Sequence, residues 1–176
     1  ASLTLLASAL GGILFGILAD RIGRTRALMA SILVYSIFTG ACGLAQSITQ
    51  LAIFRVLLGL GMGGEWATGA ALVAETWPAE HRGKALGLMQ SSWAIGYALA
   101  ALVTMIVLPR YGWRAVFFVG VLPALLTLWI RSSVREPDIW LEKVRNEASQ
   151  KFPLIEIFRS QLLKKTIVAT LMNAGT

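Results

Sequence analysis

The chain has 176 residues, of which 56% are hydrophobic and only 14% charged, and its formal net charge is +7. Soluble domains carry a charge on about a quarter of their residues, so this composition is typical of an integral membrane protein. The Lys and Arg residues lie in short clusters between apolar runs, a distribution that argues against a nucleic-acid-binding protein. The predicted fold class is therefore an all-α membrane protein.

Five apolar runs are predicted to be membrane spans, because each approaches the length of about 20 residues that a bilayer core requires. They cover residues 2–19, 27–46, 51–78, 85–108 and 115–130, and a sixth begins near residue 166. A tight turn is predicted at Pro109–Arg114, and a kink at Pro123. Small residues spaced four apart predict close helix contacts in the first span (Ser8, Gly12, Gly16) and in the fourth (Gly87, Ser91; Ser92, Gly96, Ala100).

The predicted organisation has three parts: a membrane bundle over residues 1–130, a central loop over 131–165, and the start of a second bundle at 166–176. The loop mixes both signs of charge, and residues 138–150 within it have the pattern of an amphipathic surface helix. Loops 20–26, 79–84 and 131–165 together hold 13 of the 16 Lys and Arg residues, so they are predicted to be cytoplasmic. The chain opens inside an apolar run without Met, and we expect it to be a piece of a longer, multi-pass protein of a plasma membrane or bacterial inner membrane.

Three motifs carry a resemblance to a known family. The stretch GILADRIGRTR at residues 16–26 resembles the signature between spans two and three of major facilitator superfamily transporters. RVLLGLG at 55–61 and AETWP at 74–78, followed by Arg82 and Gly83, resemble two further elements of that superfamily. The resemblance implies a partial major facilitator fold with spans two to six, the central loop and the start of span seven.

The branch of the family is indicated by Gly63-Gly64-Glu65-Trp66, which is similar to a motif of metabolite and organic-acid proton symporters, including sialate- and aromatic-acid-type carriers. Sugar porters carry PESPRW after span six. The sequence here reads REPDIW at residues 135–140. It keeps Glu136, a proline and Trp140 but otherwise departs from that pattern. This departure argues against a sugar substrate.

A cytoplasmic gate is predicted around the turn at Asp20. Glycines at 16 and 23 permit close helix approach and a tight reversal, so the Asp20 carboxylate is free to accept hydrogen bonds from a helix N-terminus. The resemblance implies a latch of this kind that closes the cytoplasmic side. The predicted gate residues are Gly16, Asp20, Arg21, Gly23, Arg24, Arg26, Glu75 and Arg82, with Glu75 and Arg82 joined to the arginines in a charge network. The alternatives are a solvated turn whose arginines only anchor the topology, and a Glu75 that is exposed at a helix end.

Arg55 and Glu65 are two charged residues inside the third span, where charges are costly and are functional hypotheses by default. They lie about 15 Å apart along a helix and point about 80° apart, so they are not expected to form an ion pair. Glu65 is predicted to be the proton site, because a carboxyl in apolar surroundings binds a proton more readily than in water. The alternatives are a Glu65 that holds two helices together and an Arg55 that caps carbonyls of a neighbouring span.

Two further groups complete the predicted site. Gly59, Gly61, Gly63 and Gly64 are assigned to helix packing, since a nucleotide-binding loop would need a preceding strand. Gln90, Trp93 and Tyr97 in the fourth span are assigned to a substrate cavity, and a lipid- or helix-facing Trp93 is the alternative.

The predicted function is proton-coupled uptake of a small organic anion by alternating access. A sugar or polyol carrier, an exporter, and a receptor that binds without transport are the alternatives. No catalytic cluster is apparent in the sequence, which argues against an enzyme, and neither a metal nor a cofactor is expected. The predicted partners are the small-molecule substrate, a proton and the lipid bilayer, and the full-length chain is expected to act as a monomer.

Overall fold

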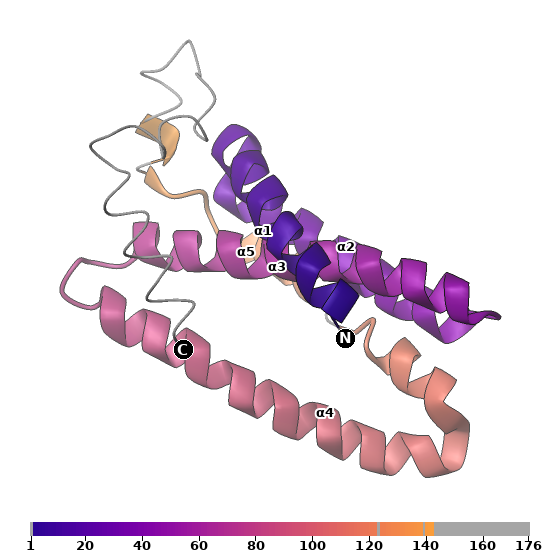
Figure 1. The fold of residues 1–176 in the computed structure, drawn as a ribbon. Coiled ribbons are helices and arrows are strands. Elements are labelled where there is room, and N and C mark those ends of the chain that lie inside the picture. The colour runs from indigo at the N-terminus through magenta and orange to yellow at the C-terminus, as the bar shows by residue number, and fades with distance from the viewer. Residues whose placement is uncertain (1, 123, 139, 143–176) are drawn as a thin grey trace. The chain divides into compact units, whose positions relative to one another are not determined.

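The computed structural model describes residues 2–122, 124–138 and 140–142. Within these ranges the regular elements are five α-helices: α1 (Ser2–Ile22), α2 (Arg24–Leu44), α3 (Ile48–Thr76), α4 (Arg82–Val119) and α5 (Ala124–Ser133). They belong to one compact unit that ends at Leu141 (Figure 1). The predicted start of a second bundle at 166–176 lies outside the described residues, as does most of the amphipathic helix expected at 138–150.

Four stretches are long and apolar enough to cross a membrane: Leu3–Ile22, Arg24–Leu44, Ile48–Thr76 and Arg82–Thr127. The last has 46 residues, more than twice the length of about 20 that one crossing needs. It is turned at Gly112, whose φ of 75° and ψ of 175° are not helical, and Figure 1 shows the chain folding back there. The expected reversal within 109–114 is therefore present at Gly112, whereas Pro109 remains inside the helix. The prediction of an all-α membrane protein is confirmed.

The predicted span over 115–130 is not one continuous helix, which corrects the sequence-based bounds. Helix α4 ends at Val119, residues 120–122 form a turn, and α5 begins at Ala124. The Ala124 N–H donates to the carbonyl of Val121 at 2.8 Å. This bond joins residues three apart, whereas an α-helical bond joins residues four apart. The proline at position 123 has no N–H to donate, which accounts for a break at this place.

Helix ends follow from local sequence. Gly23 alone separates α1 from α2, and its φ of 110° lies in a region that residues other than glycine rarely adopt. Helix α3 begins after Ser47, whose hydroxyl accepts a hydrogen bond from the Gln50 N–H at 3.2 Å. It ends one residue before Trp77, which precedes Pro78 and has an extended backbone.

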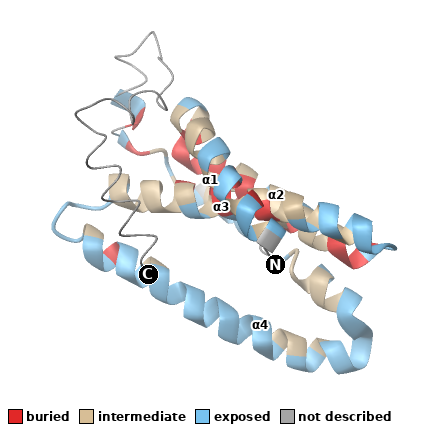
Figure 2. Ribbon diagram, in the orientation of Figure 1, coloured by how far each residue is buried: buried red, intermediate tan, exposed pale blue. Residues whose placement is uncertain are grey.

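Burial is concentrated where α1, α2 and α3 meet, and α4 is exposed along most of its length (Figure 2). The glycines of α3 create this contact. A Cβ at Gly59 would lie 2.5 Å from the carbonyl oxygen of Thr4 in α1, and one at Gly61 would lie 2.6 Å from the backbone nitrogen of Tyr35 in α2. Because neither position has room for a side chain, the backbones approach each other closely.

The small-residue contacts expected elsewhere are only partly present. In α1, Gly12 faces Gly63, but no heavy atom lies within 4 Å of the Cβ position of Gly16. The ring of Phe15 packs on Gly64 and fills the space between α1 and α3 at that level. In α4, the Cβ positions of Gly87 and Gly96 also meet nothing within 4 Å. No described residue makes the expected close contacts at Gly16, Gly87 and Gly96, so these contacts stay predictions.

Candidate functional site

Three charged side chains form a cluster where α1, α2 and α3 end or begin. The Arg24 guanidinium donates from Nη1 to Asp20 Oδ1 at 2.6 Å and from Nη2 to Glu75 Oε1 at 2.8 Å. Its Nε lies 3.0 Å from Glu75 Oε2. The side chain of Arg24 is only 11% exposed and that of Glu75 20%, so water screens these contacts weakly. One planar fork thus binds a carboxylate from each of two other helices.

A third carboxylate, that of Glu136, binds the beginning of α2. Its Oε2 accepts the Thr25 N–H at 3.1 Å and its Oε1 accepts the Arg26 N–H at 3.2 Å. Gly23 has no side chain that could cap these groups, and the Glu136 carboxyl carbon lies 2.6 Å from the position a Cβ on Gly23 would take. A carboxylate satisfies unpaired N–H groups at a helix N-terminus and interacts favourably with the helix dipole.

Trp140 adds a further contact to the same turn. Its indole Nε1 donates to the carbonyl oxygen of Asp20 at 3.1 Å, and the side chain is almost fully buried. The Thr25 hydroxyl lies 3.4 Å from the carbonyl oxygen of Arg135. The first residues of the predicted central loop therefore pack on the turn between α1 and α2. In the sequence, Glu136 and Trp140 were assigned only to the comparison with sugar porters. Their place directly after the last predicted span was a signal that they could contact the α1–α2 turn.

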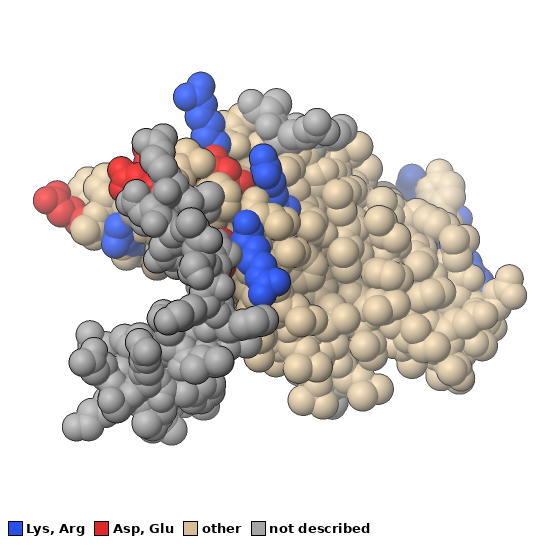
Figure 3. Space-filling model, turned by 90° about the horizontal axis from the view of Figure 1, so that it is seen from above, with Lys and Arg blue, Asp and Glu red and all other residues tan. Residues whose placement is uncertain are grey.

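Arg82, Arg26 and Arg21 are the other arginines of the predicted gate. Arg82 donates from Nε to the carbonyl oxygen of Trp77 at 3.1 Å, and among the described residues it forms no ion pair with Glu75. Arg26 is exposed and is held through its backbone N–H. Arg21 is also exposed. The structure thus pairs Glu75 with Arg24, and the predicted pairing of Glu75 with Arg82 is absent. Charged side chains gather at the ends of the helices, and the surface between them is uncharged in the view of Figure 3.

Four of the five glycines of α3 are buried, namely Gly59, Gly61, Gly63 and Gly64. Gly59 and Gly63 face the backbone of α1 at Thr4 and Ser8, and Gly61 faces α2 at Tyr35. Gly64 lies under the ring of Phe15. The stretch 59–64 is therefore surrounded by protein on two sides of α3.

Glu65 follows this glycine stretch and is partly buried. Within the described ranges its carboxylate has no hydrogen bond or ion pair, and it interacts electrostatically with the side chain of Tyr35. Arg55 is exposed, and its guanidinium carbon lies 6.0 Å from the centre of the Phe117 ring. No ion pair joins Arg55 to Glu65 in the described part of the chain, in agreement with the predicted helical geometry.

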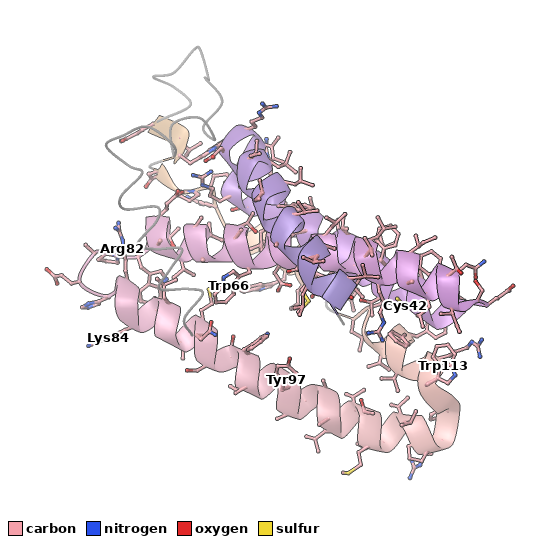
Figure 4. All side chains as sticks on the ribbon, viewed as in Figure 1. Cys42, Trp66, Arg82, Lys84, Tyr97 and Trp113 are labelled. Carbon is pink, nitrogen blue, oxygen red and sulfur yellow. The ribbon has the colours of Figure 1, made fainter. Side chains whose placement is uncertain are left out.

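Gln90, Trp93 and Tyr97 are exposed on α4. The rings of Trp93 and Tyr97 meet edge to face, with centroids 5.2 Å apart and planes at 75°. Trp66 on α3 is exposed as well (Figure 4). Within the described ranges, no three His, Cys, Asp or Glu side chains are grouped so that they could hold a metal ion.

The charge cluster at the α1–α2 turn and the buried glycines of α3 lie in the stretches whose sequence resembles a known family. The model of the Major Facilitator Superfamily matches residues 1–176. The chain belongs to the Major Facilitator Superfamily. It is an integral, multi-pass membrane protein, as its apolar helices also indicate.

Members of the Major Facilitator Superfamily with similar sequences include the sialic acid transporter NanX of Escherichia coli, 36% identical over 95% of this chain and 40% of its own. The niacin transporter NiaP of Acinetobacter baylyi is 40% identical over 77% of this chain and 31% of its own. Among solved structures, the inward open xylose transporter XylE of E. coli matches 93% of this chain and 42% of its own, at 25% identity and a TM-score of 0.71. The chain spans about two fifths of the length of the relatives it matches.

Proposed function

We propose that the chain is part of a secondary carrier that takes up a small organic anion together with a proton by alternating access. Two similar proteins are named for acids, sialic acid and niacin, which supports a carboxylate as the transported solute. In such carriers two bundles of spans move about a site near the middle of the membrane. The chain would supply part of the first bundle over residues 1–130, the central loop over 131–165 and the start of the second bundle at 166–176.

The observation that carries proton coupling is the position of Glu65. Its carboxylate is partly buried in the middle of an apolar helix, and no described group forms a hydrogen bond or ion pair with it. A carboxyl without a fixed cation can change its protonation state without breaking an ion pair. Intramembrane carboxylates of this kind are typical of proton relays. Gln90, Trp93 and Tyr97 would then line the substrate cavity, and Arg55 would attract the anion from the outer end.

The charge cluster of Asp20, Arg24 and Glu75 is proposed to be part of the cytoplasmic gate. It ties three helix ends together, so it favours the state in which those ends are close. The proposal extends to Gly16, Arg21, Gly23, Arg26 and Arg82 as neighbours of this cluster. In this proposal, loops 20–26, 79–84 and 131–165 lie in the cytoplasm. The carrier acts as a monomer in a plasma membrane or bacterial inner membrane.

The test is uptake of labelled carboxylates by the full-length protein in proteoliposomes, with and without a pH gradient. We expect Glu65→Gln to lose accumulation driven by the gradient and to keep counterflow, because exchange does not require net proton transfer. Glu80→Gln, a change to an exposed loop carboxylate, is the matched control and should keep both. Full gradient-driven accumulation in Glu65→Gln would overturn the coupling role. Absence of counterflow in the unmodified protein would indicate a receptor, and counterflow of sugars alone would indicate a sugar carrier.

A further inference from the structure

We propose that Trp66, Trp93 and Tyr97 form an aromatic subsite that selects planar, conjugated carboxylates. This inference rests on the proposed function, since it names the class of organic anion that the carrier would prefer. The three residues come from two helices, α3 and α4, that are joined by the short segment at 77–81 and therefore run in opposite directions.

The facing sides of α3 and α4 are fixed by one contact. A Cβ on Gly69 would lie 3.4 Å from Cε of Met89, which is an ordinary van der Waals distance, so Gly69 is turned toward α4 and Met89 toward α3. Trp66 precedes Gly69 by three residues and Trp93 follows Met89 by four. Residues three or four apart share a helix face, so both tryptophans lie on the facing sides. Figure 4 shows Trp66 between α3 and α4.

The two tryptophans also lie at similar depth. Because the helices are antiparallel, moving back from Gly69 and forward from Met89 leads in the same direction. Trp66 is displaced by about 4.5 Å and Trp93 by about 6 Å along their axes. Tyr97 lies one turn beyond Trp93, and its ring meets that of Trp93 at 5.2 Å. The edge-to-face pair on α4 and Trp66 on α3 therefore lie at similar depth on the facing sides of the two helices.

The depth of these rings argues against a role as interfacial anchors. Trp93 lies about 16 Å along α4 from Arg82, and Trp66 about 15 Å along α3 from Thr76, which is half of a bilayer core of about 30 Å. Aromatic residues that anchor a protein to lipid lie at the two interfaces instead. Trp66, Trp93 and Tyr97 are nevertheless 54%, 56% and 63% exposed, so the described part of the chain leaves more than half of each residue uncovered.

The chemistry of the site favours a flat ligand with a delocalised π system. Rings gain most from other π systems in stacked or edge-to-face contact, and an aliphatic or heavily hydroxylated acid offers no such face. Glu65 directly precedes Trp66, so the subsite lies at the depth of the proposed proton site. A benzoate-like anion fits this arrangement better than an acid of a saturated sugar.

The test compares two acids of equal charge and ring size, benzoate and cyclohexanecarboxylate, of which only the first is planar. Their binding to the purified full-length protein is measured by isothermal titration calorimetry. We expect about threefold to tenfold tighter binding of benzoate, which is the range that aromatic contacts provide beyond buried area. Trp93→Leu and Trp66→Leu should remove this preference, and Trp93→Phe should retain it. Trp113→Leu is the matched control, because Trp113 forms a similar edge-to-face pair with Phe117 outside the subsite and should leave the preference unchanged.

Equal affinity for the two acids, no binding of either, or an unchanged preference in both leucine variants would overturn the proposal. If Trp93→Leu fails to fold, the Trp66→Leu result decides. Quenching of the tryptophans by brominated lipid that benzoate does not reduce would show that lipid occupies the site instead. A benzoate preference in binding together with no uptake driven by a pH gradient would overturn the proposed coupling and leave the subsite intact.

Discussion

The Arg24 guanidinium binds the Glu75 carboxylate at 2.8 Å from Nη2 and 3.0 Å from Nε, across 51 positions of the chain. The same guanidinium binds Asp20, four residues before it. A single side chain at the start of α2 therefore fixes the last turn of α1 and the last turn of α3. Its removal takes the bound guanidinium away from two partly buried carboxylates.

Arg24→Ala is expected to destabilise the folded protein by about 1–3 kcal/mol, because hydrogen bonds between charged groups are lost and their partners stay partly buried. The measurement is thermal unfolding of the purified full-length protein. Arg26→Ala removes a neighbouring guanidinium that is exposed and should change stability by no more than about 0.5 kcal/mol. Equal effects of the two substitutions would contradict the assignment of Arg24 as the residue that joins the helices.

Glu136→Ala should lower stability by about 1–2 kcal/mol, since it removes both the cap of two α2 N–H groups and a negative charge at a helix N-terminus. Asp138→Ala is the control, because Asp138 is close in sequence and exposed. Hydrogen exchange at Thr25 and Arg26 gives a local readout that should rise only in the Glu136 variant. Unchanged exchange at these two amides would show that another group protects them.

Gly63→Ala should prevent correct packing of α1 on α3. A Cβ at this position would collide with the carbonyl oxygen of Ser8, and backbone cannot move aside as a flexible side chain can. We expect a loss of at least about 1–3 kcal/mol, visible as a low yield of monodisperse protein in size-exclusion chromatography.

Gly16→Ala provides the matched change in α1, where the Cβ meets no atom within 4 Å. It should be neutral or stabilising by up to about 1 kcal/mol through its effect on helix propensity. A normal yield with loss of transport would instead assign Gly16 a contact in the gate beyond the described residues.

Cys42 is expected to resist maleimide in the folded protein and to react fully after unfolding in detergent, because its side chain is completely buried. Intact-mass spectrometry before and after denaturation measures this directly. Rapid labelling of the native protein would contradict the packing of α2 described above.

The sequence predicted the helices well because membrane spans are defined by length and hydropathy, both of which are local properties. The glycine-rich third span was also interpretable, since helix-length apolar runs with several glycines have few uses other than close packing. The absence of an Arg55–Glu65 ion pair followed from helical rise and rotation alone.

Contacts between segments far apart in the chain could not be predicted from local sequence. Glu75 had several arginines at its end of the membrane, and nothing local distinguished Arg24 from Arg82 as its partner. The position of Glu136 depends on the path by which the chain after α5 returns to the α1–α2 turn. The spacing of apolar residues does not predict that path. Spacing predicted a close helix contact at Gly16, but at this position the neighbouring Phe15 ring fills the space between α1 and α3.

The backbone contact between α1 and α3 has a consequence for movement. The Cβ positions of Gly59 and Gly63 would meet the carbonyl oxygens of Thr4 and Ser8, so the two main chains are in close contact and sliding of one helix along the other is sterically hindered. We therefore expect these two helices to move as a single rigid body. Displacement is then expected of elements with looser contacts, such as the exposed part of α4 over residues 82–111, which lies between the segment 77–81 and the turn at Gly112. A spin-label distance between α1 and α3 should therefore stay constant through the transport cycle while a distance from α3 to α4 changes.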